Sequence, residues 1–303
     1  QFCNLSEVVV RETDTLDSLK RKVRIATILG TLQSTLTDFK YLRKVWKDNT
    51  EEERLLGVSL TGIMDHHVLS KNVDSKRWLE EMRQEAVETN KNFANMLGIP
   101  QSAAITCVKP SGTVSQLVDA ASGIHARHND YYIRTVRGDN KDPLTQFLIE
   151  EGVHNERDMM KPDSVTVFSF AMRSPDGAVT RTQMTATQQL ELWKTYAIHW
   201  CEHKPSITVT VKEHEWMEVG AWVYENFDVA SGVSFLPHSD HTYQQAPYQD
   251  IEPDDYNDWQ KTYSHVKIDW NKLTEFEKED NTSGSRELAC AAGVCEVVDL
   301  NAA

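Results

Sequence analysis

Residues 103–115 have the sequence AAITCVKPSGTVS, in which a short apolar run is followed at once by turn-forming residues. The run Ala103–Val108 predicts a buried β-strand, which Pro110 and Gly112 terminate. A helix beginning near Thr113 would direct its free N–H groups at any ligand held by the loop. The segment is therefore a candidate phosphate-binding loop. It does not have the P-loop pattern, and a plain tight turn is the alternative interpretation.

The sequence on both sides of this loop alternates between helix and strand patterns. Apolar residues at three- and four-residue steps predict helices over 15–46, 75–97, 187–203 and 212–226. Alternating β-branched residues predict strands over 165–172, 206–211 and 233–236. The turn residues 174–177 predict a hairpin that pairs the first of these strands with 178–182. Such alternation is typical of an α/β architecture.

Composition excludes several classes of protein. The 303 residues carry a net charge of −14, which argues against a broad nucleic-acid surface. No run of about 18 apolar residues predicts a membrane span. Five cysteines in this length do not indicate a secreted disulfide scaffold, so a reducing cytoplasm is the expected compartment. The start at Gln1 lacks an initiator Met and signal-peptide features, as expected for a piece of a longer protein.

Two cysteines stand close together near the end of the chain. Cys290 and Cys295 follow a small-residue linker and have only Ala, Gly and Val between them. Such a backbone can bring two Cα atoms to the roughly 4.4–6.8 Å that a disulfide needs. A mobile dithiol also suits exchange with a buried disulfide. Two unrelated thiols, or half of a zinc site, are the alternatives.

Other polar residues allow weaker hypotheses. His199 and His203 have the i, i+4 spacing of helical metal ligands, but such pairs are more often surface or core histidines, and we predict no metal site. Cys107 is interpreted as a packing cysteine. A basic cluster could neutralise polyphosphate or lie on a solvated face; its members are His125, Arg127, His128, Arg134 and Arg137.

Several segments match one known family in the same order. Residues 2–8 (FCNLSEV) resemble its stretch around an active-site redox cysteine, and residues 108–114 (VKPSGTV) resemble its substrate-phosphate loop. Further matching segments are RLLGVSLTGIMD at 54–65, GIH at 123–125, YYIR at 131–134, LP at 236–237 and QQAP at 244–247. Together with the spacing of Cys290 and Cys295, they resemble the monomeric, adenosylcobalamin-dependent (class II) ribonucleotide reductases.

The resemblance implies a fold and a set of site residues. Residues 1–280 would form the C-terminal half of a ten-stranded α/β barrel, and residues 281–303 a flexible redox-active tail. Cys3 would be one of two active-site redox cysteines, which Cys290 and Cys295 re-reduce. The substrate phosphates would be held by Pro110, Ser111, Gly112, Thr113, Val114 and Ser115.

The resemblance also implies a reaction and its partners. Ribonucleoside triphosphates would be reduced to 2′-deoxyribonucleoside triphosphates by a cobalamin-initiated thiyl-radical mechanism. The radical cysteine, in an Asn-Pro-Cys-x-Glu context, is not in this sequence. An N-terminal half would supply it and share the adenosylcobalamin, and a thioredoxin-like protein would re-reduce the tail. This chain alone would be inactive.

Two other functions remain open at this stage. A fragment of a class I reductase large subunit would have a similar barrel and tail, although the segment 244–247 favours the cobalamin-dependent class. A non-catalytic nucleotide-binding fragment would retain the loop but would have no need of Cys3, Cys290 and Cys295. A redox carrier is disfavoured because the sequence has no Cys-x-x-Cys motif.

Overall fold

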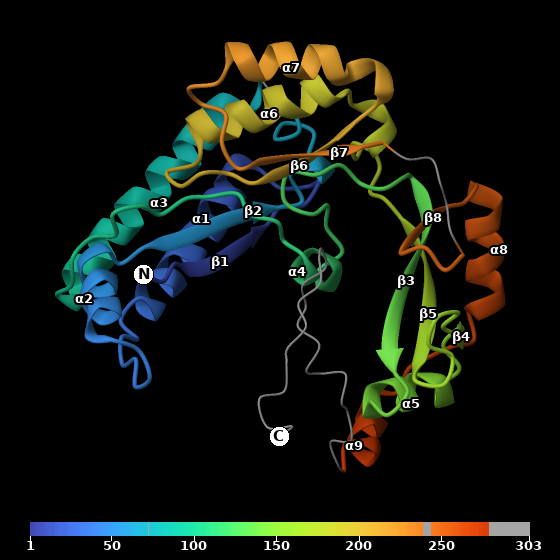
Figure 1. The fold of residues 1–303 in the computed structure, drawn as a ribbon. Helices are drawn as coiled ribbons and strands as arrows, with labels where there is room; N and C mark the ends of the chain where they lie inside the picture. Colours follow the sequence, from blue (N-terminus) through green and yellow to red (C-terminus); the bar gives the residue numbers. More distant parts are fainter. Residues whose placement is uncertain (72, 239–243, 279–303) are drawn as a thin grey trace, which may run out of the picture. The chain divides into compact units, whose positions relative to one another are not determined.

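A computed structural model describes residues 1–71, 73–238 and 244–278, and Figure 1 traces them. The chain forms two compact units. Unit 1 contains residues 1–130 and 174–240, and unit 2 contains residues 131–173 with the chain from 241 onward. The sequence patterns do not predict that the chain leaves unit 1 at residue 131 and returns to it at residue 174. The predicted tail, residues 281–303, lies outside the described residues.

Unit 1 is built on parallel strands. Strand β1 (Asn4–Val9) pairs in parallel with β2 (Leu56–Thr61). Residues 103–108, predicted as a strand, make only an isolated parallel bridge between Thr106 and Val58. Two backbone hydrogen bonds of 3.0 and 2.8 Å from β2 hold this segment in place. Because β1 and β2 are parallel, their carboxyl ends lie at one edge of the sheet.

A second parallel pair lies beyond the 103–108 segment. Strand β6 (Ile207–Val211) pairs with β7 (Val233–Pro237), which confirms both predicted strands. The N–H of Ser206 donates to the carbonyl of Val108 at 2.9 Å, so the segment is tied to β2 on one side and to the start of β6 on the other.

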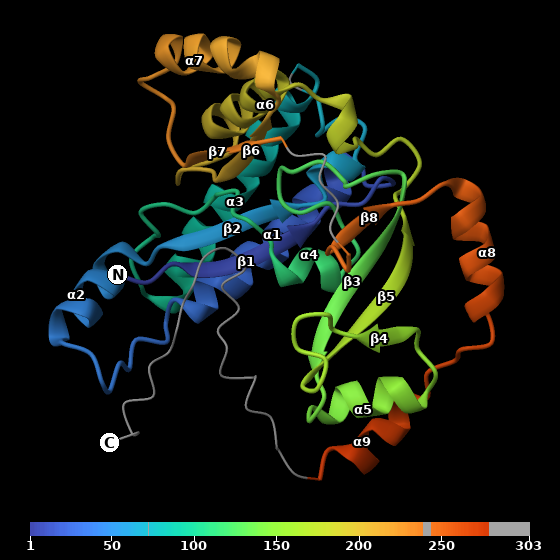
Figure 2. The same cartoon turned by 45° about the vertical axis from the view of Figure 1, so that its right-hand side comes forward.

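Helices cover these strands. Helix α1 (Leu16–Gln33) packs on β1, β2 and α3 (Ser75–Leu97), and α6 (Ala186–His199) packs on β6 and α7 (Trp216–Glu225). Figures 1 and 2 show the helix pairs α1–α3 and α6–α7. The shorter helical elements of unit 1 are α2 (Lys44–Glu53), η1 (Ile63–Asp65), α4 (Thr113–Leu117), η2 (Arg181–Gln183) and η3 (Glu213–Glu215).

Three aromatic residues of α6 and its end anchor the core. Trp193, Tyr196 and Trp200 have no exposed surface. Each donates its polar hydrogen to a backbone carbonyl, as buried aromatic donors must. The Trp200 indole N–H reaches the carbonyl of Cys107 at 2.7 Å. The core therefore fixes the segment that leads into the candidate phosphate loop.

The predicted helix over 15–46 is wrong in its second half. Helix α1 ends at Gln33, and α2 begins only at Lys44. The hydroxyls of Thr27, Thr31 and Ser34 donate to backbone carbonyls three or four residues earlier. Such bonds compete with the helical pattern, and the turn-forming residues that follow do not restore it. The predicted helix over 75–97 is confirmed.

Unit 2 is an antiparallel sheet with flanking helices. Its strand order is β4-β5-β3-β8, with bounds Asn155–Arg157, Val165–Arg173, Tyr131–Asp139 and Tyr248–Asp250. The predicted hairpin is wrong, because β5 pairs with β3 and β4 rather than with 178–182. Figure 2 shows α8 beside this sheet. The helical elements are α5 (Pro143–Glu150), α8 (Pro253–Tyr263), η4 (Trp270–Lys272) and α9 (Leu273–Phe276).

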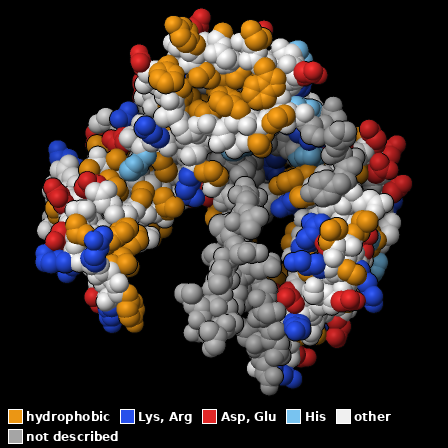
Figure 3. Space-filling model, in the orientation of Figure 1, with side chains coloured by type: hydrophobic (Ala, Val, Ile, Leu, Met, Phe, Trp, Pro, Cys, Tyr) orange, Lys and Arg blue, Asp and Glu red, His pale blue; other side chains and the backbone are white. Residues whose placement is uncertain are grey.

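Some apolar surface remains exposed in unit 1. Met217 and Tyr224 on α7 are 86% and 85% exposed, and Figure 3 shows hydrophobic side chains gathered over α6 and α7. None of the described helices is long and apolar enough to cross a membrane.

The backbone at Gly62 gives a first testable prediction. Gly62 has φ +84°, and a Cβ there would lie 2.3 Å from the Val10 carbonyl oxygen. Gly62→Ala should lower the free energy of unfolding by at least about 1–3 kcal/mol, measured by urea denaturation. Gly220→Ala on α7, where a Cβ meets no atom within 4 Å, is the control and should be neutral or stabilising. Equal stability of the two variants would contradict the steric argument.

Candidate functional site

The candidate phosphate loop is tied to strand β1 by a carboxylate. The Ser111 hydroxyl donates to Glu7 Oε1, and Lys109 Nζ lies 3.9 Å from Glu7 Oε2. Glu7 Oε2 is buried and accepts no hydrogen bond within the described residues. The Lys109 N–H donates to Ser59 Oγ on β2 at 3.2 Å. Residues on β1 and β2 therefore determine where the loop begins.

The polar groups that the loop offers are mainly backbone N–H groups. Ser115 is fully buried, and its hydroxyl donates to the carbonyl of Gly112 at 2.8 Å. The hydroxyls of Ser111 and Ser115 are thus already engaged. In the described part of the chain, the N–H groups of Ser111 and Gly112 donate no hydrogen bond. Gly112 has φ +53°, a conformation that favours glycine. An anion would be bound by these N–H groups.

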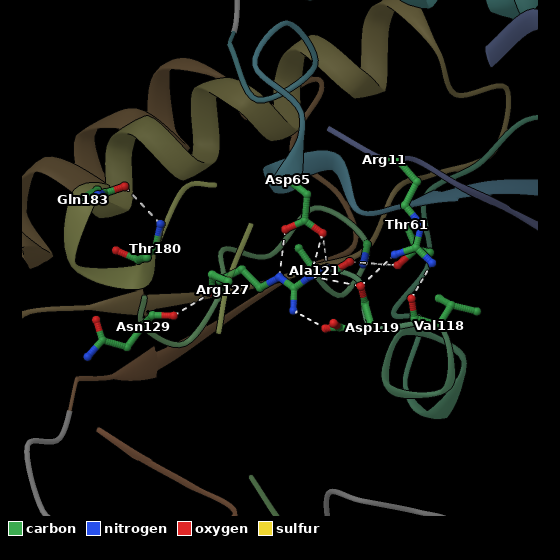
Figure 4. A network of polar contacts seen from close by, with 12 residues as sticks. Arg11, Thr61, Asp65, Val118, Asp119, Ala121, Arg127, Asn129, Thr180 and Gln183 are labelled. Atoms are coloured by element: carbon green, nitrogen blue, oxygen red, sulfur yellow. Dashed lines mark hydrogen bonds and ion pairs between the residues drawn. The ribbon is translucent and has the colours of Figure 1, made fainter. Parts of the chain in front are cut away.

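A buried ion-pair network holds the far end of the loop (Figure 4). Arg127 Nε and Nη2 donate to the two oxygens of Asp65 at 2.8 and 2.9 Å, and Nη1 donates to Asp119 Oδ1 at 2.8 Å. Asp65 Oδ2 also accepts the Ala121 N–H at 2.8 Å. Arg11, just after β1, donates to the carbonyls of Val118 and Asp119. The turn after α4 is therefore fixed to the carboxyl ends of β1 and β2.

Cys3 lies beside a second thiol that the sequence does not suggest as a neighbour. Cys3 directly precedes β1 and is exposed, yet partial burial of its sulfur raises the pKa of the thiol. Cys107 is buried, as predicted. Burial first, and then the nearby Cys3, raise the pKa of Cys107 to about 12. Both sulfurs approach Gly57 of β2: a Cβ on it would lie 3.0 Å from Cys3 Sγ and 3.4 Å from Cys107 Sγ.

A cavity of about 340 Å³ lies at the carboxyl ends of β6 and β7. Its lining includes His125, Thr208, Thr210, Lys212, Leu236 and His238. The His125 Nδ1–H donates to the Ser122 carbonyl at 3.0 Å, and Nε2 accepts the Thr208 N–H at 3.0 Å. Burial lowers the pKa of His125, which is consistent with a neutral ring.

The two other polar groupings from the sequence have a different arrangement in the structure. His199 Nδ1 contacts Glu80, whereas His203 Nε2 donates to the Leu56 carbonyl, so the two rings have different partners. Among the described residues, no cluster of three or more His, Cys, Asp or Glu side chains has the arrangement of metal ligands. The basic cluster is divided between the two units, and Arg127 and Arg137 form ion pairs with carboxylates.

Comparison with known proteins identifies relatives of this chain. No protein-family model matches it. The adenosylcobalamin-dependent ribonucleoside-triphosphate reductase of Euglena gracilis is 28% identical over 264 residues, which cover 85% of this chain and 35% of that protein. A probable enzyme of the same description from Dictyostelium discoideum is 27% identical over 314 residues, which cover 99% of this chain and 39% of that protein.

A solved structure of a B-12 dependent (class II) ribonucleotide reductase has the same fold. It matches 92% of this chain and 42% of its own, with a TM-score of 0.75 and 20% identity. The chain is a homologue of the adenosylcobalamin-dependent ribonucleoside-triphosphate reductases. It spans 35% to 43% of the length of the curated reductases it matches. The recognition made from the sequence is confirmed.

For this reductase homologue, the predicted site residues are brought together only in part. Cys3 directly precedes the strand whose Glu7 accepts the Ser111 hydroxyl, so one strand connects the predicted redox cysteine with the predicted phosphate loop. Cys290 and Cys295 lie outside the described residues, and their roles stay predictions. No local pattern in the sequence indicates that Glu7, Asp65 and Arg127 are partners of the loop and its neighbours, because their contacts join residues far apart in the chain.

The Arg127 network gives a prediction that compares two carboxylates. Asp65 has a side chain only 3% exposed, whereas that of Asp119 is 56% exposed. Asp65→Asn leaves a buried guanidinium without its main counter-charge and should cost about 3–5 kcal/mol of unfolding free energy. Asp119→Asn, the control, should cost less than about 1 kcal/mol. Urea denaturation measures both. Equal losses of unfolding free energy in the two variants would show that the buried Asp65–Arg127 pair does not hold the fold more firmly than the exposed Asp119 contact.

His125 predicts how stability depends on pH. Because burial lowers its pKa in the folded state, the unfolded chain binds the proton more readily than the folded chain. Stability should therefore be complete above about pH 6.5, the ordinary histidine pKa, and should decline as the pH falls below it. Burial also lowers the pKa of His66, so His66 should likewise reduce the stability of the fold as the pH falls. The loss between pH 7.5 and 5.5 should be smaller in His125→Gln, and an unchanged loss would contradict the assignment.

Proposed function

We propose that this chain forms part of an adenosylcobalamin-dependent ribonucleoside-triphosphate reductase, to which it contributes a redox cysteine and the substrate-phosphate loop. The observation that carries the proposal is the hydrogen bond from Ser111 to Glu7. It joins the loop to β1, the strand that Cys3 directly precedes. A triphosphate held at the loop would then place its sugar along the same sheet face as the thiol, which is the positioning that such chemistry requires.

The proposed reaction balances with one substrate and two thiols. A ribonucleoside triphosphate and two thiols give a 2′-deoxyribonucleoside triphosphate, a disulfide and water. The 2′ oxygen leaves as the water, and the thiols supply two electrons and two protons. Cys3 would be one thiol, and the other would come from a part of the reductase that this sequence does not contain. Cys290 and Cys295 would then reduce the disulfide by exchange, and a thioredoxin-like protein would reduce the tail.

The backbone of the loop would hold the phosphates. The N–H groups of Ser111 and Gly112 supply two donors, and the α4 turn follows them. The Glu7 carboxylate would repel a phosphate, but Lys109 and the Ser111 hydroxyl compensate its charge. The phosphates would therefore bind on the side of the loop away from Glu7. Pro110, Thr113 and Val114 complete the proposed segment.

The cavity at β6 and β7 fits one part of adenosylcobalamin. Its volume of about 340 Å³ is at the low end of the roughly 300–1,000 Å³ typical of ligand pockets. It combines the hydroxyls of Thr208 and Thr210 and the Lys212 ammonium with the apolar Leu236. These residues suit a nucleoside, so they would hold the adenosyl group, and the corrin ring would need further surface. The bound cofactor would supply radical chemistry.

A groove lies along the edge of β1 that faces away from β2. It supports the proposal that another part of the reductase forms the other half of a ten-stranded barrel and completes the fold here. The groove has a volume of about 680 Å³ and is lined by β1 and α1. Leu5, Ile25 and Leu29 in it are 50%, 54% and 58% exposed. The N–H groups of Asn4 and Val10 point at β2, so those of the alternate residues point away from it. No strand of the described residues pairs with this edge, which suits a further strand with its helix.

The test is co-expression of this chain with the reading frame for the rest of the reductase. Deoxynucleotide formation from ribonucleoside triphosphates and a dithiol is measured with and without adenosylcobalamin. Product that requires the cobalamin is the expected result. An assembled complex that makes no product, or that makes it without cobalamin, would contradict the proposed function.

Two cysteine variants separate the proposed roles within that assay. Cys3→Ser should abolish even a single turnover of prereduced enzyme. Cys290→Ser should allow the single turnover and prevent multiple turnovers with thioredoxin. Cys201→Ala, in a buried thiol outside the proposed site, is the control and should cycle normally.

A further inference from the structure

Gly57 lies on β2 where the sulfurs of Cys3 and Cys107 both approach the position that its side chain would occupy. It is opposite Leu5 in the parallel register. A Cβ on Gly57 would lie 2.4 Å from Leu5 Cδ2, 3.0 Å from Cys3 Sγ and 3.4 Å from Cys107 Sγ. The first distance is shorter than real Cβ contacts, and the second is tighter than nine in ten of them, so a side chain here would force its neighbours to move.

Space, rather than backbone conformation, explains this glycine. Gly57 is not among the glycines with positive φ, so an alanine could adopt its backbone geometry. Glycine within a strand costs roughly 0.5–1 kcal/mol relative to alanine. Such a residue in a strand buried at every position marks a close approach by other atoms. The atoms that approach are the Leu5 side chain and the two thiols.

We propose that Gly57 is a positioning residue for Cys3: by having no side chain, it leaves the space in which the Cys3 thiol lies against β2 and beside Cys107. The proposal rests on the proposed redox role of Cys3. The Leu5 side chain is half-exposed and can rotate away from an added methyl group. After Leu5, the Cys3 sulfur is the atom nearest to an added methyl group, so it is the next group that the methyl group would displace.

The properties of Cys107 indicate that Cys3, rather than Cys107, is the thiol available for exchange chemistry. Its high pKa keeps it protonated near neutral pH, and a thiol, unlike a thiolate, is a poor nucleophile. The ionisable groups around it are Cys3, Cys201, Lys109 and Glu7, and the last two act on its pKa in opposite directions. Cys107 is therefore an uncharged neighbour, and exchange chemistry falls on Cys3.

The test measures the reactivity of each thiol in the chain as it stands. Wild type, Gly57→Ala and the control Gly220→Ala are alkylated with iodoacetamide from pH 6.5 to 10, and the peptide containing each cysteine is quantified by mass spectrometry. In Gly57→Ala the displaced Cys3 thiol should lose its shielding, and the midpoint of its pH–rate profile should fall. A fall of half a pKa unit raises the rate at pH 7.5 about threefold. Gly220→Ala should match wild type.

Cys201 reports whether the variant is still folded. It is buried, and burial raises its pKa well above the ordinary value, so it should remain unlabelled unless the fold opens. If Gly57→Ala exposes Cys201, the double variant Leu5→Ala/Gly57→Ala removes the shortest contact and repeats the test. A Cys3 profile equal to that of wild type in a folded variant would overturn the proposal.

The outcome is independent of catalysis. A shifted Cys3 profile in Gly57→Ala supports the positioning role even if the assembled enzyme makes no deoxynucleotide. Conversely, an unshifted profile together with cobalamin-dependent product would leave the proposed function standing and remove the role of Gly57.

Discussion

The pairing of Arg127 with Asp65 is the interaction on which the rest of unit 1 depends. A buried guanidinium is tolerated only when its charge and its donors are satisfied, and Asp65, with a contribution from Asp119, satisfies them. The backbone of Arg127 also exchanges hydrogen bonds of 2.9 and 2.8 Å with Val179 and Arg181. One residue thus joins the end of β2, the turn after α4 and the segment that returns from unit 2. The candidate phosphate loop lies between two fixed points, of which the Arg127 network is one.

The other fixed point is the sheet itself. Parallel pairing puts the carboxyl ends of neighbouring strands at one edge, where ligands of α/β proteins usually bind. Here the Glu7 side chain on β1 reaches the loop that follows the 103–108 segment, across the width of β2. The thiol of Cys3 and the N–H groups of the loop are consequently positioned by the same few strands. Small shifts of β2 would affect both.

The sequence predicts local structure well where one periodicity dominates. The helix over 75–97 and the strand over 206–211 are examples, since each has a regular apolar pattern and clear terminators. Strand β3 was missed because Arg134 and Arg137 suggest a solvated basic surface. In the structure Arg137 pairs with Asp158, and Arg134 lies over the Tyr248 ring. The contact between Glu7 and Ser111 joins residues that no local pattern relates. The family resemblance could indicate the site, but not these contacts.

Two glycines of the candidate site are required for different physical reasons. One belongs to the proposed phosphate loop, and the other lies beside the proposed redox cysteine. Gly112 permits a backbone conformation that presents N–H groups, whereas Gly57 leaves room for a sulfur atom. Backbone N–H groups do not titrate, so phosphate binding by the loop would follow only the ionisation of the ligand. Thiol exchange follows the thiolate fraction of Cys3, which burial reduces near neutral pH. The proposed substrate binding and thiol exchange should therefore respond differently to pH, because one uses fixed dipoles and the other a titrating sulfur.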